Sequence, residues 1–358
     1  MIAIILGTRP EILKMSPVIR QCEKNCVDYF ILHTGQHYSY EMDRIFFEEL
    51  ELPKPKYNLN IGSGSHAEQT AKMLVSIEKV LIEEEPSLVL VHGDTNTTLA
   101  GALASAKLHI PIGHVEAGLR SFDRKMPEEI NRVLVDHISD YLFAPTDNAK
   151  LNLLKEGIEE SKIFVTGNTI VDAVYQNLEI AMKRSNILER LSLKPKNYFL
   201  VTLHRQENVD FKERLEKIIE GLRLIYEEFS TTMVLPIHPR TKKMIEEFGL
   251  NLDGINTINP VGFMDFLQLE ANAKLILTDS GGVQEESCIL GVPCVTLRET
   301  TERPETIEVG ANILAGVEPE RILISVKKMI ERKNKWQNPF GDGKAAERIL
   351  KITLGVLK

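Results

Sequence analysis

The run IAIIL (2–6) passes directly into GTRPE (7–11). It is apolar on both faces and rich in isoleucine, which is typical of a parallel strand covered by helices on both sides. Pro10 suits the first turn of a following helix. Ten further short apolar runs end in the same way, at residues 27–32, 87–91, 110–115, 141–144, 163–165, 198–203, 232–237, 255–258, 274–278 and 292–297. The alternation of such strands with helices predicts an α/β fold of the doubly wound type.

The runs form two groups, and 358 residues exceed the size of one typical domain. A helical stretch at 169–190 and the linker-like segment LKPK (193–196) lie between the groups. We predict an N-terminal domain over residues 1–190, a second domain over 191–342 and a final amphipathic helix over 343–358. Two sheets whose polar edges face each other would form one cleft.

The chain carries 43 Lys and Arg against 51 Asp and Glu, a formal net charge of −8. This charge excludes global attraction to nucleic acid but leaves room for a local site for a small anion. No apolar run reaches the roughly 18 residues of a membrane helix, and the N-terminus lacks the basic start of a signal peptide. We therefore expect a cytoplasmic protein without nucleic-acid or membrane partners. We expect Cys22, Cys26, Cys288 and Cys294 to be reduced, buried thiols.

Polar clusters follow nearly every predicted strand. They lie at residues 7–11, 34–37, 92–95, 114–118, 203–208, 237–240, 279–282 and 298–303. Ligands of parallel α/β sheets bind beyond the carboxyl ends of the strands, so these clusters mark the candidate site.

The segment Asp279-Ser280-Gly281-Gly282 ends one predicted strand and opens a helix. Small residues at a helix N-terminus leave backbone N–H groups available to an anion, which the helix dipole also favours. The segment therefore predicts a phosphate cradle, although an ordinary helix cap has the same pattern. Glu286 on the same helix could accept hydrogen bonds from a ribose diol or could be a solvated helix carboxylate.

Three cations are candidates for neutralising a diphosphate. Arg9 lies in the turn before the first helix, Lys14 lies on that helix, and Arg303 lies in a Thr/Glu-rich loop of the second half. A guanidinium binds phosphate through two parallel hydrogen bonds, and an ammonium adds a point charge. The alternative is that these residues are ordinary surface cations.

Asp94, Glu116 and Glu128 are the candidate acid/base groups. Asp94 and Glu116 end successive strands and are expected to lie near each other. Proton transfer needs carboxyl groups whose surroundings shift their pKa values. Glu128 is explained equally well by the helix dipole and an i,i+4 pair with Arg132. His204 could bind phosphate or relay a proton, although a lone histidine there is more often structural.

The segment GSGSHA (62–67) matches the dinucleotide pattern G-x-G-x-x-G/A. Residues 54–60 before it are polar and interrupted by proline, so the buried strand that would confirm a nicotinamide site is missing. The chain has no P-loop, H-E-x-x-H, G-x-S-x-G or zinc spacing. We therefore predict no cofactor and no metal.

Eight segments together resemble the non-hydrolysing UDP-N-acetylglucosamine 2-epimerases. They are GTRPEILKMSP (7–17), TGQH (34–37), VHGDTNTT (91–98), GHVEAGLRS (113–121), PEEINR (127–132), HRQEN (204–208), TDSGGVQEES (278–287) and TTERPE (300–305). The resemblance implies a glycosyltransferase-B-like fold of two Rossmann-like domains, with the last helix returning to the first domain, and a homodimer. It implies reversible conversion of UDP-N-acetylglucosamine (UDP-GlcNAc) to UDP-N-acetylmannosamine (UDP-ManNAc) without metal or redox cofactor, a product that could supply a cell-envelope polysaccharide.

The resemblance also implies roles for individual residues. The acid/base carboxylates are Asp94, Glu116 and Glu128, and His204 belongs to the catalytic site. The residues implied to bind UDP are Arg9, Lys14, Ser280, Gly281, Gly282 and Glu286, with Arg303 near the diphosphate. A consistent route eliminates UDP to form 2-acetamidoglucal and then re-adds it, with cations and helix N–H groups stabilising the leaving diphosphate.

Bacterial members of the family share a second, regulatory UDP-GlcNAc site. Gln36, His37, Arg205 and His238 match part of that pattern and are candidate regulatory residues. Ser39 stands where a glutamine is common, and the 62–65 loop lacks the arginine often found nearby.

Three other functions remain open at this point. A hydrolysing relative would release ManNAc and UDP. A UDP-sugar glycosyltransferase with the same fold would need an acceptor site and would not need three clustered carboxylates. A non-catalytic nucleotide-sugar binding protein would need none of them.

Overall fold

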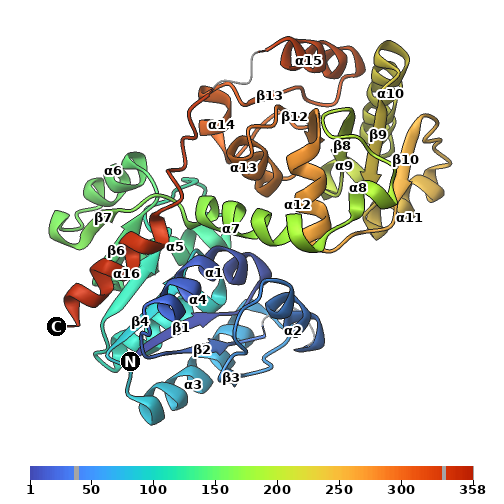
Figure 1. The fold of residues 1–358 in the computed structure, drawn as a ribbon. Helices are drawn as coiled ribbons and strands as arrows, with labels where there is room; N and C mark the ends of the chain where they lie inside the picture. Colours follow the sequence, from blue (N-terminus) through green and yellow to red (C-terminus); the bar gives the residue numbers. More distant parts are fainter. Residues whose placement is uncertain (36–39, 333–335, 358) are drawn as a thin grey trace. The chain divides into compact units, whose positions relative to one another are not determined.

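The computed structural model describes residues 1–35, 40–332 and 336–357 (Figure 1). The chain divides into two compact units, one comprising Met1–Gln176 with Phe340–Lys358 and the other Asn177–Pro339. In the described residues each unit contains a parallel sheet flanked by helices, which confirms the predicted α/β class. No helix in these ranges is both long and apolar enough to cross a membrane.

The first unit (unit 1) contains a seven-stranded sheet in the order β3-β2-β1-β4-β5-β6-β7. Its strands are β1 Ile2–Leu6, β2 Tyr29–His33, β3 Tyr57–Asn58, β4 Leu88–His92, β5 Ile112–Val115, β6 Tyr141–Ala144 and β7 Ile163–Val165. Its helices are α1 Arg9–Lys24, α2 Tyr40–Glu49, α3 His66–Glu84, α4 Asn96–Lys107, α5 Pro127–Ile138, α6 Asp147–Lys155, α7 Thr169–Arg184, which continues toward the second unit, and α16 Ala345–Val356; a 3₁₀ turn spans Glu160–Lys162.

The second unit (unit 2) contains a six-stranded sheet in the order β10-β9-β8-β11-β12-β13. Its strands are β8 Tyr198–Thr202, β9 Thr232–Pro236, β10 Ile255–Ile258, β11 Leu275–Thr278, β12 Cys294–Thr296 and β13 Asn312–Leu314. Its helices are α8 Ile187–Arg190, α9 Gln206–Val209, α10 Lys212–Phe229, α11 Pro239–Phe248, α12 Phe263–Asn272, α13 Gly281–Ile289, α14 Pro304–Glu308 and α15 Pro319–Glu331.

Both strand orders place the ligand-binding position of a doubly wound sheet beside the unit's first strand. In each unit the next two strands in sequence are added on one side of the first strand. The later strands are then added on its other side. The loops after the two central strands leave toward opposite faces, which opens a crevice at their carboxyl ends. These strands are β1 and β4 in unit 1 and β8 and β11 in unit 2.

The core of unit 2 shows why its central strand β8 is buried along its whole length. Successive side chains of β8 enter two different clusters, with Phe199 and Val201 in one and Tyr198 and Leu200 in the other. Side chains of a strand alternate between faces, so a sheet covered on both sides buries every position. The sequence pattern of the strands follows from this burial.

The structure differs from the sequence-based expectations in its short strands and in one cysteine. Every predicted run overlaps a strand, but β3 and β13 were not predicted because they are only two and three residues long and carry polar residues. Cys22, Cys288 and Cys294 are buried, whereas Cys26 is exposed. The prediction of a buried thiol was wrong for Cys26 because it lies in the turn that follows α1.

The division between the units falls inside α7, before the boundary predicted at residue 190, and the chain returns to unit 1 at Phe340. The first half of α7 contacts unit 1, where Asp172 accepts hydrogen bonds from the backbone of Ala345 and Ala346. After the end of α7, Ser185 donates to Asp265 of unit 2 at 2.5 Å. The proline-containing linker at 193–196 follows the helical stretch. The division between the two units lies earlier, within α7.

Candidate active site

Glu116 occupies the end of β5 in a conformation that few residues adopt. It follows Val115 directly, and its φ of 73° lies in the left-handed region, which costs a non-glycine residue on the order of 1–3 kcal/mol. Its carboxylate lies 2.5 Å from Nζ of Lys14 on α1 and 3.7 Å from Nε2 of the buried His92. Backbone strain of this kind clusters at functional sites. The structure therefore joins two predicted site residues that are far apart in sequence.

Asp94 follows the neighbouring strand β4. The register pairs His92 with Val115, so Asp94 and Glu116 leave adjacent strand ends. Arg132 on α5 forms an ion pair with the Asp94 carboxylate, and Asn131 donates to the Asp94 carbonyl at 2.8 Å. Helix α5 is thus tied to the end of β4.

Glu128 lies in the first turn of α5, where its side chain is exposed. The next residue, Glu129, is buried and accepts from the backbone N–H of Ser121 and Phe122, both at 2.9 Å, and from Arg132 at 2.9 Å. Burial raises the pKa of Glu129, but these donors outweigh burial and hold the pKa below its usual range. Glu129 therefore fixes the start of the helix that carries Glu128.

A buried network of charged side chains contacts the backbone next to Asp94. His114 on β5 has Nδ1 at 2.6 Å from Asp136 and Nε2 at 2.8 Å from the carbonyl of Gly93. Arg120 contacts the other Asp136 oxygen at 2.7 Å. Burial raises the pKa of Asp136, but His114 and Arg120 outweigh it and lower the pKa overall. The network fixes the backbone immediately before Asp94.

Glu11 is buried at the candidate site. In the sequence it stood out only as the last residue of the segment GTRPE (7–11). Its carboxylate accepts from the N–H of Gly7 at 3.0 Å and from the hydroxyls of Thr8 at 2.8 Å, Thr95 at 2.8 Å and Thr98 at 3.1 Å. Burial raises the pKa of Glu11 despite these donors. Its place in the first helical turn did not distinguish it from a solvent-exposed, dipole-stabilising carboxylate.

In unit 2, Asp279 organises the end of β8. It is fully buried and accepts from the N–H of Arg205 at 2.9 Å, while Nδ1 of His204 lies 3.2 Å from its carboxylate. Burial raises the pKa of Asp279, but the contacts with His204 and Arg205 lower it overall. The rings of His204 and His238 lie 6.2 Å apart, so the structure places a candidate regulatory residue beside a candidate catalytic one.

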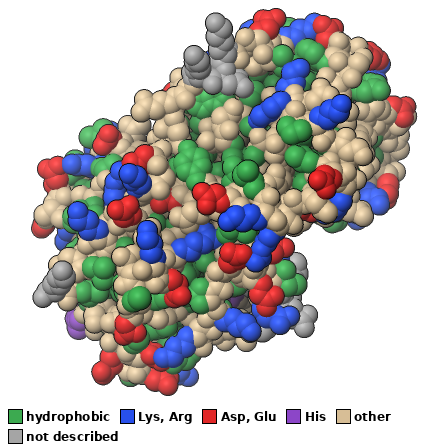
Figure 2. Space-filling model, in the orientation of Figure 1, with side chains coloured by type: hydrophobic (Ala, Val, Ile, Leu, Met, Phe, Trp, Pro, Cys, Tyr) green, Lys and Arg blue, Asp and Glu red, His purple; other side chains and the backbone are tan. Residues whose placement is uncertain are grey.

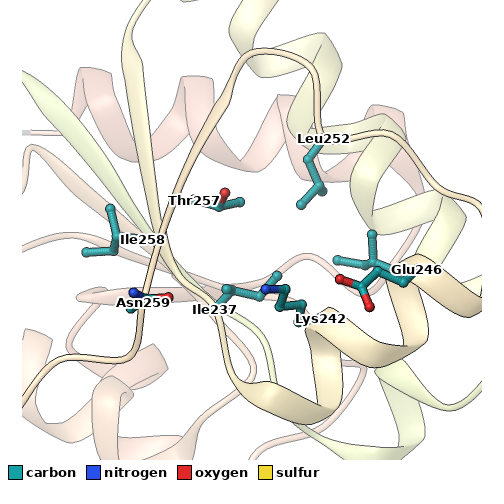
Figure 3. Close-up of a pocket in the computed structure, with 8 residues that line it drawn as sticks. Ile237, Lys242, Glu246, Leu252, Thr257, Ile258 and Asn259 are labelled. Carbon is teal, nitrogen blue, oxygen red and sulfur yellow. The ribbon is translucent and has the colours of Figure 1, made fainter.

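A cavity of about 200 Å³ adjoins these histidines. Pro260, Val261, Phe266 and Val283 give it apolar walls, and His204, His238 and Ser280 give it polar groups. A second cavity, of about 500 Å³, lies between the end of β10 and α11 (Figure 3). Its lining residues, which include Lys242, Glu246 and Thr257, contain no predicted site residue.

The predicted phosphate cradle begins α13. Ser280 is the N-cap and its side chain makes no capping hydrogen bond, while Gly282 is exposed. A Cβ added to Gly281 would lie 2.6 Å from Oε1 of Glu302, so a larger residue here would require the Glu302 side chain to move. Arg205 is paired with the same Glu302 at 2.9 Å.

Of the remaining candidate residues, Arg9 lies in unit 1, and Glu286 and Arg303 lie in unit 2. Arg9 begins α1 with its guanidinium 5.7 Å from the ring centre of Phe46. Arg303 precedes α14 with Nε 3.2 Å from Glu285, and Glu286 is half-buried on α13. Gln36 and His37 lie outside the described residues.

The surface and the titratable groups give two further observations. On the face shown in Figure 2, acidic and basic side chains are interspersed rather than gathered by sign. Within the described ranges, no group of three or more His, Cys, Asp or Glu side chains is arranged to hold a metal ion.

The strand orders and the polar groups at both switch points define a protein of two Rossmann-like α/β units. A family model described as UDP-N-acetylglucosamine 2-epimerase matches residues 20–354. The UDP-N-acetylglucosamine 2-epimerase of Methanocaldococcus jannaschii is 62% identical over 358 residues, which cover 98% of each chain. The chain therefore belongs to the UDP-N-acetylglucosamine 2-epimerase family, and it has the family's glycosyltransferase-B-like fold.

Two further comparisons concern ligands and substrates. The crystal structure of the M. jannaschii UDP-GlcNAc 2-epimerase in complex with UDP-GlcNAc and UDP is similar with a TM-score of 0.86 and 62% identity, and 99% of each chain is covered. A UDP-2,3-diacetamido-2,3-dideoxy-D-glucuronate 2-epimerase of Pseudomonas aeruginosa is 44% identical over 349 residues, 96% of this chain and 97% of its own.

Proposed function

We propose that the protein interconverts UDP-GlcNAc and UDP-ManNAc by eliminating UDP and adding it back, without net hydrolysis. The observation that carries the proposal is the pair of carboxylates at adjacent strand ends, Glu116 against Lys14 and Asp94 against Arg132. A binding protein for a nucleotide sugar has no need for acidic groups held in this way. The similarity to an epimerase crystallised with UDP-GlcNAc and UDP supports the same substrate.

The chemistry requires more than one acid/base group. A carboxylate removes the proton from C2 while the C1–O bond breaks and its electron pair leaves with UDP, which gives 2-acetamidoglucal. The return step places a proton on the opposite face of C2 while a diphosphate oxygen bonds to C1. Removal and delivery on opposite faces call for two differently placed groups, and Asp94, Glu116 and Glu128 supply the candidates.

Unit 2 supplies the groups proposed to bind the nucleotide. The N–H groups at the start of α13, beside Ser280, Gly281 and Gly282, suit a diphosphate, and Arg303 adds positive charge. The apolar cavity beside His204 suits the flat uracil ring. These donors stabilise the charge that develops on the leaving UDP.

The resemblance adds finer proposals. Gln36, His37, Arg205 and His238 would take part in regulation by UDP-GlcNAc. The enzyme would act as a homodimer in the cytoplasm, and its product would serve a cell-envelope polysaccharide.

The test is proton NMR of the purified protein with UDP-GlcNAc in D2O, without added NAD or metal. We expect UDP-ManNAc carrying deuterium at C2 and no free sugar. Free ManNAc with UDP would replace the proposal with a hydrolysing reaction. The same experiment with UDP-2,3-diacetamido-2,3-dideoxy-glucuronate tests the alternative substrate that the Pseudomonas relative suggests. Turnover of that sugar alone would overturn the assignment of UDP-GlcNAc.

A further inference from the structure

A pair of acidic side chains lies beside the proposed nucleotide site in unit 2. Glu270, near the end of α12, has an exposed fraction of 0%. Glu286, the proposed ribose-binding residue, is half-buried on α13. The two helices pack against each other and lie close together in Figure 1. The family resemblance implies a UDP-binding role for Glu286, whereas Glu270 has no role in the proposed function.

The surroundings of Glu270 indicate that its carboxyl carries a proton. Neither of its oxygens accepts a hydrogen bond from a donor among the described residues, and the side chain that it meets is Glu286. Two ionised carboxylates can only accept, so they bond to each other only when one is protonated. Burial, the charge of Glu286 and the hydrogen bond between them raise the pKa of Glu270 well above its usual value. The proton belongs on Glu270 because Glu286 is the more exposed partner.

The other titratable groups around this carboxyl do not neutralise it. Tyr198 on β8 donates its hydroxyl to the backbone of α12 at 2.5 Å, and burial raises the pKa of Cys294 on β12 to about 12. Lys196 binds two backbone carbonyls at the end of α12, at 2.8 and 3.1 Å, and burial lowers its pKa. On α13, Glu285 faces Arg303. Glu286 is therefore the ionisable side chain whose charge acts on the carboxyl of Glu270.

We propose that Glu270 is a positioning residue that donates a hydrogen bond to Glu286 and holds that carboxylate toward the hydroxyls of a bound ribose. The inference rests on the proposed function because it takes UDP as the ligand and Glu286, a candidate from the sequence, as the ribose-binding group. A neutral donor is required at position 270, so an amide can replace the carboxyl and a hydrocarbon cannot. Ionisation of Glu270 at alkaline pH would set two negative charges together and disturb ribose binding.

The test compares wild type with Glu270→Gln and Glu270→Leu by calorimetric titration with UDP. Near pH 7, we expect Glu270→Gln to keep the UDP Kd within about twofold and Glu270→Leu to raise it about tenfold, as for loss of one charge-assisted hydrogen bond. In the epimerase assay the loss should appear in KM and not in kcat. Asp172→Ala, which alters a buried carboxyl of unit 1, is the control for general destabilisation and should leave the UDP Kd unchanged.

The dependence on pH tests the shared proton separately. As pH rises from about 6 to about 9, the UDP Kd of wild type should rise relative to that of Glu270→Gln because Glu270 ionises beside Glu286. This pH measurement needs only wild type and Glu270→Gln, so it can be made even if Glu270→Leu does not fold. Parallel pH curves, or equal losses in the amide and leucine variants, would overturn the inference.

The outcomes also separate this inference from the proposed function. A wild-type protein that neither binds UDP nor turns over UDP-GlcNAc contradicts the proposed function. A wild-type protein that does both, with Glu270 variants indistinguishable from it at every pH, contradicts only the role of Glu270.

Discussion

The ammonium of Lys14 on α1 lies 2.5 Å from the carboxylate of Glu116 at the end of β5, and both side chains are largely buried. The resemblance implies a UDP-binding role for Lys14, whereas in the structure Lys14 contacts a candidate acid/base group. The contact places a positive charge beside a carboxylate that we propose exchanges a proton.

Replacing Lys14 should therefore impair turnover more than nucleotide binding. We expect Lys14→Met to lower kcat about 10²-fold, the scale of one lost electrostatic contact in an active site, and to weaken UDP binding less than tenfold. Initial rates by NMR and calorimetry measure the two effects. Lys24→Met, at the exposed end of the same helix, is the matched control. Normal kcat with weak UDP binding would show that Lys14 serves only the phosphate.

The three carboxylates should be needed for turnover and not for binding. We expect Asp94→Asn, Glu116→Gln and Glu128→Gln each to lower kcat by about 10³-fold, within the range of lost general acid/base catalysis. UDP affinity should change little because the proposed UDP contacts in unit 2 are intact. Exposed Glu83→Gln on α3 serves as control. Full activity in all three variants would disprove the mechanism.

Asp136 should make stability depend on pH. Its folded pKa is lowered because His114 and Arg120 outweigh the effect of burial. A lowered pKa stabilises the fold above the unfolded pKa of about 3.9, and this stabilisation is lost as pH falls below that value. We expect Asp136→Asn to cost about 3–5 kcal/mol at pH 7, as for a broken buried ion pair.

Urea unfolding at several pH values measures this effect. The free energy of unfolding should fall more steeply below about pH 4 in wild type than in Asp136→Asn. Exposed Asp28→Asn should follow the wild-type curve. Identical slopes in wild type and Asp136→Asn would rule out this role for the network.

An apolar stripe on α5 predicts where the expected homodimer forms. Met126, Ile130 and Leu134 recur every four residues and are 38%, 44% and 47% exposed, and Phe122 before them is 75% exposed. Exposed apolar stripes of this kind mark interaction surfaces. Light scattering after gel filtration should show a dimer for wild type and a monomer for Leu134→Glu. Leu151→Glu, at a similarly exposed position on α6, should remain a dimer.

The last helix should depend on Asp172. This buried carboxylate accepts from the N–H groups of Ala345 and Ala346, at 3.2 and 3.0 Å, and so caps α16. Asp172→Ala leaves two N–H groups without their acceptor, and we expect it to cost about 2–4 kcal/mol in urea unfolding. Glu347→Ala, on the exposed side of α16, should cost little. Equal stability of both variants would argue against the cap.

The fold was largely predictable because a strand buried on both faces has a distinctive composition. The run at 2–6 became β1 without change, and the run at 141–144 became β6. Tyr57–Asn58 and Asn312–Leu314 escaped prediction because a strand of two or three residues needs no apolar run. The division between the units was not predicted because it falls inside a continuous helix, α7, where no change in sequence pattern marks it.

The position of the site followed from chain order, whereas its chemistry did not. Parallel strands bring their carboxyl ends to one edge, so Asp94, Glu116, His204 and Ser280 could be placed at sheet edges from sequence. The burial of Glu11 and the contact of Glu270 with Glu286 had no sequence signal, since each depends on residues from another element.

Sequence alone was sufficient to establish the class of fold and the position of the polar residues at strand ends, because burial imposes a local apolar pattern on each strand. The family resemblance followed from the eight quoted segments. Tertiary structure alone revealed which charges are paired and which carboxyl groups are buried. The partners of such a pair are brought together only by folding, since Lys14 and Glu116 lie about a hundred residues apart in the chain.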